Sequence, residues 1–167
     1  MASQITCSPS KNVPKSTYKS FKQLPNMAEG ENWMTRVVIS LTWNEVDFLG
    51  TNEVQSLDLL MIDENGDQLH GVVPKKFIWK FEPLLHEGVA YSLSKLNLAA
   101  EKNIFRPARN DKRAFFEWNT EVQALDSTAV KIPRHKFSFT AFEELESCTA
   151  NTYLTGKHFE TSPSAKH

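Results

Sequence analysis

Residues 55–74 read QSLDLLMIDENGDQLHGVVP and predict two antiparallel strands joined by a tight turn. Leu57, Leu59 and Met61 alternate along the first half, which places their side chains on one face of a strand. The Asn65–Gly66 dipeptide is the strongest short hairpin signal, because both residue types tolerate the left-handed backbone that two-residue turns require. The chain must therefore return antiparallel, and the final proline ends the second strand because it has no backbone N–H to donate.

Three further segments show the alternation that is typical of strands. Residues 33–43 are dense in β-branched and aromatic side chains, and Val37 and Ile39 share one face. Residues 89–98 and 114–125 alternate in the same way. The sequence therefore predicts five strands, three of them before residue 75 and two after residue 88.

One helix is expected between the third and fourth strands. Apolar residues from Phe77 to Leu85 recur at helical spacing, and Gly88 is in position to end the helix. Pro83 predicts a kink or two short helices, because it removes a donor and disfavours helical geometry at the preceding residue. The order β-β-β-α-β-β favours an all-β protein with one helix, a five-stranded OB-fold barrel, because closure removes exposed strand edges.

Length and composition favour one folded domain with tails. The chain has 167 residues, of which 40% are hydrophobic, and contains no apolar run long enough to span a membrane. Residues 1–30 are rich in Ser, Pro and Lys and are expected to form a flexible basic tail. An OB-fold domain with a C-terminal trailer is expected over residues 31–147 and a second tail over 148–167. We expect a soluble intracellular protein that does not associate with membranes.

The charges are balanced overall but segregated along the chain. Nineteen basic and twenty acidic residues give a net charge of −1, which provides no general attraction to nucleic acid. Residues 37–74 contain seven acids and no Lys or Arg, whereas residues 102–113 contain five cations and one acid. Any site for a polyanion must therefore be local.

The sequence offers little for catalysis or metal binding. Only two cysteines are present, Cys7 and Cys148, so no C-x-x-C site can form. The five histidines are scattered, and no glycine-rich phosphate loop occurs. We therefore expect a non-enzymatic protein with no catalytic residues, no metal ligands and no cofactor.

Several short motifs resemble the first single-strand DNA-binding OB domain of the replication protein A large subunit, especially its plant variants. The resemblance covers Trp33 to Leu145. Its motifs are Leu57–Gly66, Leu69–Lys76, Lys80–Tyr91, Phe105–Pro107, Ile132–Phe139 and Phe142–Leu145. It implies a single-module fragment or short paralogue that acts on DNA in the nucleus, during replication, recombination or repair. Other replication protein A subunits are then candidate partners.

The resemblance also implies which residues contact DNA. Phe105 matches an aromatic residue that stacks on bases, in the loop between the fourth and fifth strands. The matching position of a second stacking aromatic holds Pro74, so half of the stacking pair is missing. His70 matches a basic residue near phosphate, where a histidine of ordinary pKa is only partly charged at neutral pH.

Binding of a single strand requires exposed aromatic faces for the bases and cations for the phosphates. Phe105 is the predicted stacking residue. The other predicted nucleic-acid-binding residues are Arg106, Arg109, Lys102, Lys112, Trp43, Lys75 and Arg36. Alternative roles remain open for four of them: Phe105 as a cap on the barrel core, Trp43 as packing, Lys75 as part of a polar helix face, and Arg36 in an ion pair with an acid of strand two.

Two function classes follow. The leading hypothesis is binding of single-stranded DNA without strong sequence preference, with RNA left open as a ligand. The alternative is a degenerate OB-fold protein-interaction module that has lost DNA binding, which Pro74 and the acidic stretch favour. Trp79 and Trp118 are expected in the core or its shell and have no assigned role.

Overall fold

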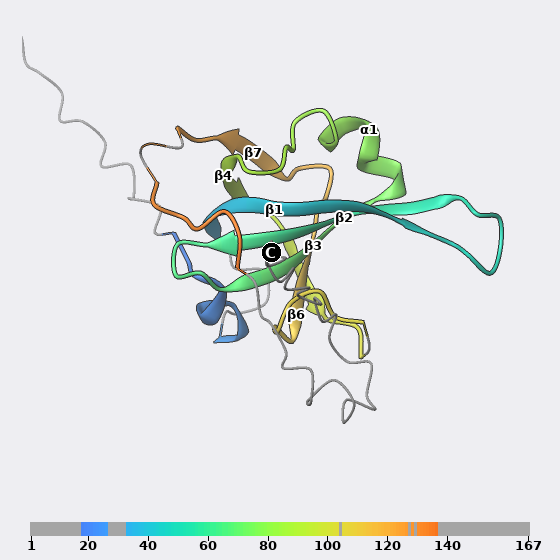
Figure 1. The fold of residues 1–167 in the computed structure, drawn as a ribbon, viewed down its shortest axis with the longest axis horizontal. Helices are drawn as coiled ribbons and strands as arrows, with labels where there is room; N and C mark the ends of the chain where they lie inside the picture. The colour runs from blue at the N-terminus through green and yellow to red at the C-terminus, as the bar shows by residue number, and fades with distance from the viewer. Residues whose placement is uncertain (1–17, 27–32, 104, 127, 129, 137–167) are drawn as a thin grey trace, which may run out of the picture.

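One curled sheet of seven strands forms most of the protein (Figure 1). The structure is a computed structural model that describes residues 18–26, 33–103, 105–126, 128 and 130–136. The strands are β1 (Met34–Val46), β2 (Val54–Asp63), β3 (Gln68–Pro74), β4 (Ala90–Ser94), β5 (Asn97–Ala100), β6 (Lys112–Phe115) and β7 (Glu121–Ala124). They are ordered β5-β6-β3-β2-β1-β4-β7 across the sheet.

The pairing pattern bends this sheet into a small barrel. β1 pairs antiparallel with β2 and with β4, β2 with β3, and β3 runs parallel to β6. β5 pairs with β6, and β4 pairs with β7. β4 and β5 are consecutive in the chain but lie near opposite edges of the sheet, so the segment that holds them connects those two edges. This arrangement confirms the predicted all-β class with one helix and an OB-like barrel.

The expected strand count of five is corrected to seven because the last two predicted strands are each interrupted. The fourth breaks after Ser94, where Lys95 takes a positive φ of 57°. The fifth breaks at a turn in which Thr120 Oγ1 accepts a hydrogen bond from the Glu117 amide and donates one to the Lys95 carbonyl. The two interruptions face each other and are joined by that hydroxyl.

The predicted hairpin between β2 and β3 is confirmed. Gly66 has a φ of 77°, in the left-handed region that favours glycine. The Asp63 carboxylate accepts hydrogen bonds from the amides of Asn65 and Asp67 and thereby closes the turn. The hairpin between β1 and β2 is longer and projects well beyond the barrel (Figure 1).

The predicted helix consists of two short pieces, as expected, but their boundary lies between Phe77 and Ile78, and Glu82 keeps helical dihedrals despite the following Pro83. A 3-10 turn, η2 (Lys75–Phe77), leads into a four-residue helix, α1 (Ile78–Phe81). Phe81 is buried and packs edge-on against Phe116, with ring centroids 5.2 Å apart. The helix is thereby fixed to the barrel.

Residues 18–26, which the sequence assigned to the N-terminal tail, take part in the fold. They include a 3-10 helix, η1 (Phe21–Asn26), whose Phe21 and Leu24 are buried in the core. The Phe21 amide donates to the Asp63 carboxylate at 2.8 Å. The core that these residues join is lined by alternate side chains of the central strands, including Ile39, Leu59 and Met61.

Candidate nucleic-acid interface

The outer face of the sheet carries an aromatic and a buried polar group side by side. Trp43 of β1 pairs with Asp58 of β2, and His70 of β3 pairs with Leu60, which lies two residues after Asp58 on the same strand. The period of two along a strand places Trp43, Asp58 and His70 on one face. The indole of Trp43 stacks on the imidazole of His70, with centroids 5.7 Å apart and planes 18° apart.

His70 is held between two carboxylates. Its Nε2 lies 2.8 Å from Asp58 Oδ2 and its Nδ1 lies 2.8 Å from Glu101 Oε2. The histidine side chain is 1% exposed, and both carboxylates are buried. Burial alone lowers the pKa of His70, but the hydrogen bonds to Asp58 and Glu101 outweigh it, so the pKa is raised above its ordinary value.

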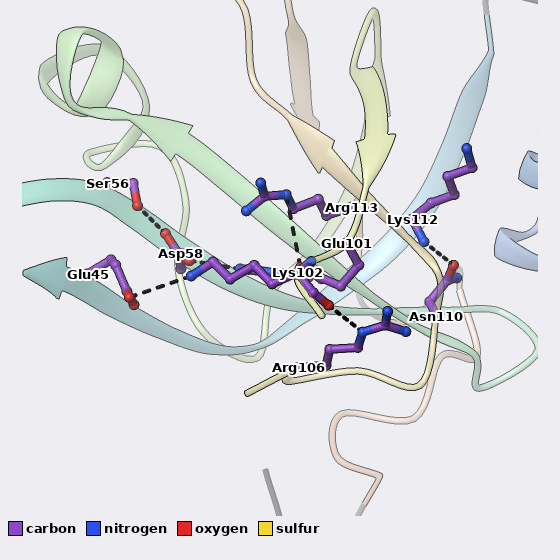
Figure 2. Close-up of polar contacts among 10 residues, drawn as sticks. Glu45, Ser56, Asp58, Glu101, Lys102, Arg106, Asn110, Lys112 and Arg113 are labelled. Carbon is purple, nitrogen blue, oxygen red and sulfur yellow. Dashed lines mark hydrogen bonds and ion pairs between the residues drawn. The ribbon is translucent and has the colours of Figure 1, made fainter. Parts of the chain in front are cut away.

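Glu101 connects this network to the loop between β5 and β6. Burial acts to raise the pKa of Glu101, but its hydrogen bonds to His70 and to the Lys102 amide lower it below the ordinary value. The Glu101 amide donates to the Asp111 carbonyl at 2.9 Å. Arg113 Nε lies 4.0 Å from Glu101 Oε1 (Figure 2). One buried residue therefore anchors both ends of the loop over residues 101–111.

Phe105 lies in this loop with its ring exposed. The side chain is 52% exposed, which excludes the alternative that it caps the barrel core. Its φ is 55°, a backbone conformation that a bulky residue rarely adopts and that the surrounding loop must hold.

Arg106 braces the loop from inside. Its Nε donates to the Lys102 carbonyl (Figure 2). Its guanidinium pairs with Asp111 at 3.0 Å, and the side chain is only 16% exposed. Arg106 therefore acts first as a structural brace, with part of its charge compensated by the loop itself.

The other predicted cations of this loop have different partners. Lys102 reaches Glu45 on the β1–β2 hairpin, with 3.5 Å between Nζ and Oε1 (Figure 2). Arg109 is exposed, and the backbone amide of Lys112, at the start of β6, donates to Asn110 Oδ1. Phe105, Lys102 and Arg109 therefore belong to one loop, and Lys112 follows it at the start of β6, where its side chain lies on the opposite face of the strand from Arg113.

The last two predicted residues lie elsewhere. Lys75 follows β3 and pairs with Glu53 on the β1–β2 hairpin at 2.6 Å. Arg36, at the opposite end of β1 from that hairpin, pairs with Glu64 at 3.2 Å and lies over the Tyr18 ring at 3.9 Å. Its partner acid follows β2, so the ion-pair alternative holds for Arg36, and the structure does not bring it to the Phe105 loop.

Sequence reasoning placed three residues wrongly. His70 is buried between two carboxylates and does not face solvent where a phosphate would lie. Trp79 and Trp118 were expected in the core or shell but are 66% and 61% exposed. No local signal could reveal these positions, because they depend on how distant segments pack.

The described residues contain no group of three or more histidine, cysteine or acidic side chains that could hold a metal ion. Cys7, Cys148 and most of the expected C-terminal trailer lie outside those residues. No helix in the described part of the chain is long and apolar enough to cross a membrane.

Comparisons with known proteins place this geometry in a family. The sequence profile of the family described as "Domain of unknown function DUF223" matches residues 22–147. The chain belongs to the DUF223 family. The match of this DUF223 domain begins within η1, in agreement with the buried position of that helix. No curated protein sequence matches the chain significantly.

Two solved structures resemble the DUF223 chain to different degrees. One is a chain of a replication protein A heterotrimer bound to ssDNA, with a TM-score of 0.55 and 21% identity over 74% of this chain. The match spans only 29% of that protein's length. Another is DNA-binding domain A of S. cerevisiae replication protein A, with a TM-score of 0.45 and 16% identity over 57% of this chain and 84% of the other. The first match supports an OB fold like that of replication protein A.

Proposed function

We propose that this DUF223 chain binds single-stranded DNA without strong sequence preference through the loop between β5 and β6. The observation that carries the proposal is the exposed ring of Phe105 within a cationic loop that the buried Glu101 anchors. An aromatic face accepts any base, so stacking on Phe105 provides affinity without reading sequence. The neighbouring cations Lys102, Arg109 and Lys112 contact the phosphates.

The binding we propose is weak for a single domain. Lys102 pairs with Glu45, Lys75 with Glu53 and Arg106 with Asp111, so a phosphate must compete with a carboxylate at each of these cations. One stacked base contributes about 1 to 3 kcal/mol. We expect dissociation constants in the micromolar range or weaker unless the domain is tethered to another binder.

The biological setting is part of the proposal. The heterotrimer of similar fold was studied bound to ssDNA. By analogy we propose a nuclear, non-enzymatic role in DNA replication, recombination or repair, with other replication protein A subunits as candidate partners. We further propose that the chain is a single-module relative of the first DNA-binding domain, resembling the plant variants.

Fluorescence anisotropy of labelled oligo-dT and oligo-U, side by side, tests the proposal. Salt-sensitive binding of oligo-dT at tens of micromolar protein is expected, and F105A should weaken it by about 1 to 3 kcal/mol. L84A is the control, because Leu84 is similarly exposed but lies outside the loop. Absence of any binding by the unaltered protein would refute the proposal, whereas tighter binding of oligo-U would change the ligand to RNA.

A protein-interaction role is the second candidate, and the same ion pairs favour it. Each pair shows that the hairpin acids Glu45 and Glu53 already bind cations at this face. A basic peptide would bind the acids in place of Lys75 and Lys102. This function is supported instead if a labelled oligolysine peptide binds and oligo-dT does not.

A further inference from the structure

Two exposed tryptophans form an aromatic platform outside the Phe105 loop. Trp79 belongs to α1 and Trp118 to the turn between β6 and β7, and their ring centroids lie 6.2 Å apart with planes tilted by 46°. The ring centroid of Phe77 lies 6.3 Å from that of Trp118. Exposed neighbouring rings of this size are unusual on a soluble protein and indicate a binding surface.

The platform is held in place by hydrogen bonds. Trp79 Nε1 donates to the Lys76 carbonyl at 2.9 Å, which fixes the orientation of that indole. Lys80 Nζ donates to the Trp118 carbonyl and therefore connects α1 to the turn. The rings are thus positioned before any ligand arrives, which reduces the ordering cost of binding.

Two lysines border the platform and are available to an anion. The ammonium of Lys80 lies 4.5 Å from the Trp118 ring centroid, and that of Lys76 lies 4.8 Å from the Phe77 centroid. Among the described residues, no carboxylate forms an ion pair with either lysine, including Glu82 and Glu117, which flank the two segments in sequence. Lys75, Lys102 and Arg106, in contrast, each pair with an acid.

We propose that Trp79, Trp118, Lys76 and Lys80 form a second contact site for single-stranded nucleic acid, where a base stacks on an indole and a lysine binds the adjacent phosphate. The inference rests on the proposed function, because it assigns the same class of ligand. Figure 1 shows α1 and the loop over residues 101–111 on opposite sides of the β1–β2 hairpin. A strand must therefore be long to reach both sites.

The chemistry of the platform favours nucleic acid over a protein partner. An apolar protein surface would leave the ammonium groups of Lys76 and Lys80 desolvated beside the rings, at a free-energy cost. A nucleotide satisfies rings and ammonium groups together, because each base has a phosphate within one nucleotide. The competing occupants, an acidic peptide and a second copy of this chain, become outcomes of the test.

The experiment measures oligo-dT binding as a function of length for the full chain. The probes have about 6 and about 20 nucleotides, since one OB fold covers about 4 to 16. The variants are W79A/W118A and K76Q/K80Q, with L84A as control. Thermal unfolding of each variant confirms that it folds, and if the tryptophan variant does not fold, the lysine variant provides the test.

The W79A/W118A variant should lose about 5-fold to about 100-fold in affinity for the longer probe, which corresponds to about 1 to 3 kcal/mol. The gain in affinity from the short to the long probe should largely disappear. K76Q/K80Q should reduce the slope of log K against log salt by about 1.4, or about 0.7 for each phosphate contact.

Three results would overturn the inference. If both variants bind the long probe as the unaltered protein does while F105A weakens it, the proposed function stands and the platform does not bind bases. If the platform variants instead abolish self-association in sedimentation, or capture of an oligoglutamate peptide, the occupant is protein. If no form of the protein binds either probe, the proposed function and the platform fail together.

Discussion

His70 is the residue whose surroundings differ most from what the sequence indicates. From the sequence, His70 is expected to be exposed to solvent and only partly charged. In the structure, Asp58 and Glu101 enclose its side chain. The three residues come from β2, β3 and the segment after β5, which are far apart in sequence. No motif search finds such a network, because only the curled sheet brings its members together.

The raised pKa of His70 predicts that stability depends on pH. A group whose pKa is higher in the folded state stabilises the fold fully below its unfolded value, about 6.5, and this contribution is lost as the pH rises through the folded value. The free energy of unfolding should therefore fall above neutral pH. Urea denaturation from about pH 5 to about pH 9 measures it. H70Q is the control, and an identical pH dependence in H70Q would contradict the assignment.

Glu101 predicts the opposite behaviour at acidic pH. Its lowered pKa means that its contribution to stability is present above the ordinary value of 4.5 and is lost as the pH falls through the lowered folded value. The contribution of the network should therefore be largest between about pH 4.5 and 6.5. E101Q should remove the acid limb of this profile in the same urea measurement and leave the β5–β6 loop less protected from hydrogen exchange.

Removal of the imidazole should be severe. H70A leaves two buried carboxylates without their shared partner, and loss of one member of a buried charged group costs about 3 to 5 kcal/mol. The urea midpoint of H70A should fall accordingly, whereas L84A, at an exposed position, should change stability by about 0.5 kcal/mol or less. A loss in H70A as small as that in L84A would show that water replaces the imidazole.

At the scale of elements, η1 is part of the core. Phe21 is fully buried, and its amide is hydrogen-bonded to Asp63. F21A should therefore destabilise the protein by about 3 to 5 kcal/mol, as large-to-small changes of buried Phe do. K22A is the matched control, since Lys22 is exposed in the same helix. Equal unfolding midpoints for F21A and K22A would show that η1 docks only weakly.

Elements set by local chemistry could be predicted from the sequence, and those set by packing could not. The β2–β3 hairpin follows from Asn65–Gly66, and a short helix that ends before Pro83 follows from the proline. The breaks at Lys95 and before Thr120 depend on a hydrogen bond between two segments, so alternation alone predicts continuous strands there. The role of residues 18–26 was missed for the same reason, because two apolar side chains among polar neighbours do not indicate a core contribution.

At the scale of the whole molecule, charge is nearly balanced, so attraction to nucleic acid must come from a few contacts. If three cations contact phosphates, log K should fall by about 2 for each tenfold rise in salt. Anisotropy titrations of oligo-dT at several salt concentrations measure this slope. A slope near zero would show that stacking without phosphate contacts accounts for the affinity.

The acids of the β1–β2 hairpin should limit binding. E45Q/E53Q frees Lys102 and Lys75 from their carboxylate partners and adds two units of positive charge to the local field. We expect oligo-dT binding that is tighter by no more than about a few-fold, because exposed ion pairs are weak. E64Q/E121Q is the control for charge alone, because it removes two exposed, paired acids that lie outside the β1–β2 hairpin, and an equal gain in that variant would show that these pairings are not the cause.

The candidate site was predictable in its sequence-local part only. The loop with Phe105 and its cations could be found because one short segment holds them. The sequence could not show whether the ring of Phe105 is exposed, because an aromatic residue serves equally well as a cap on the core and as a stacking surface. The platform of Trp79 and Trp118 joins two segments separated by three strands, and single-sequence periodicity does not show which side of a four-residue helix meets solvent.

The carboxylate of Asp63 has a practical meaning for work on this domain. Its Oδ1 accepts hydrogen bonds from two amides of the β2–β3 turn, and its Oδ2 accepts one from the Phe21 amide. A shortened version that begins at Trp33 would keep every strand but would lack the buried side chains of Phe21 and Leu24. Its Asp63 carboxylate would also lose the hydrogen bond from the Phe21 amide. Expression trials should therefore retain the polypeptide from Tyr18 onward, even though every strand begins later.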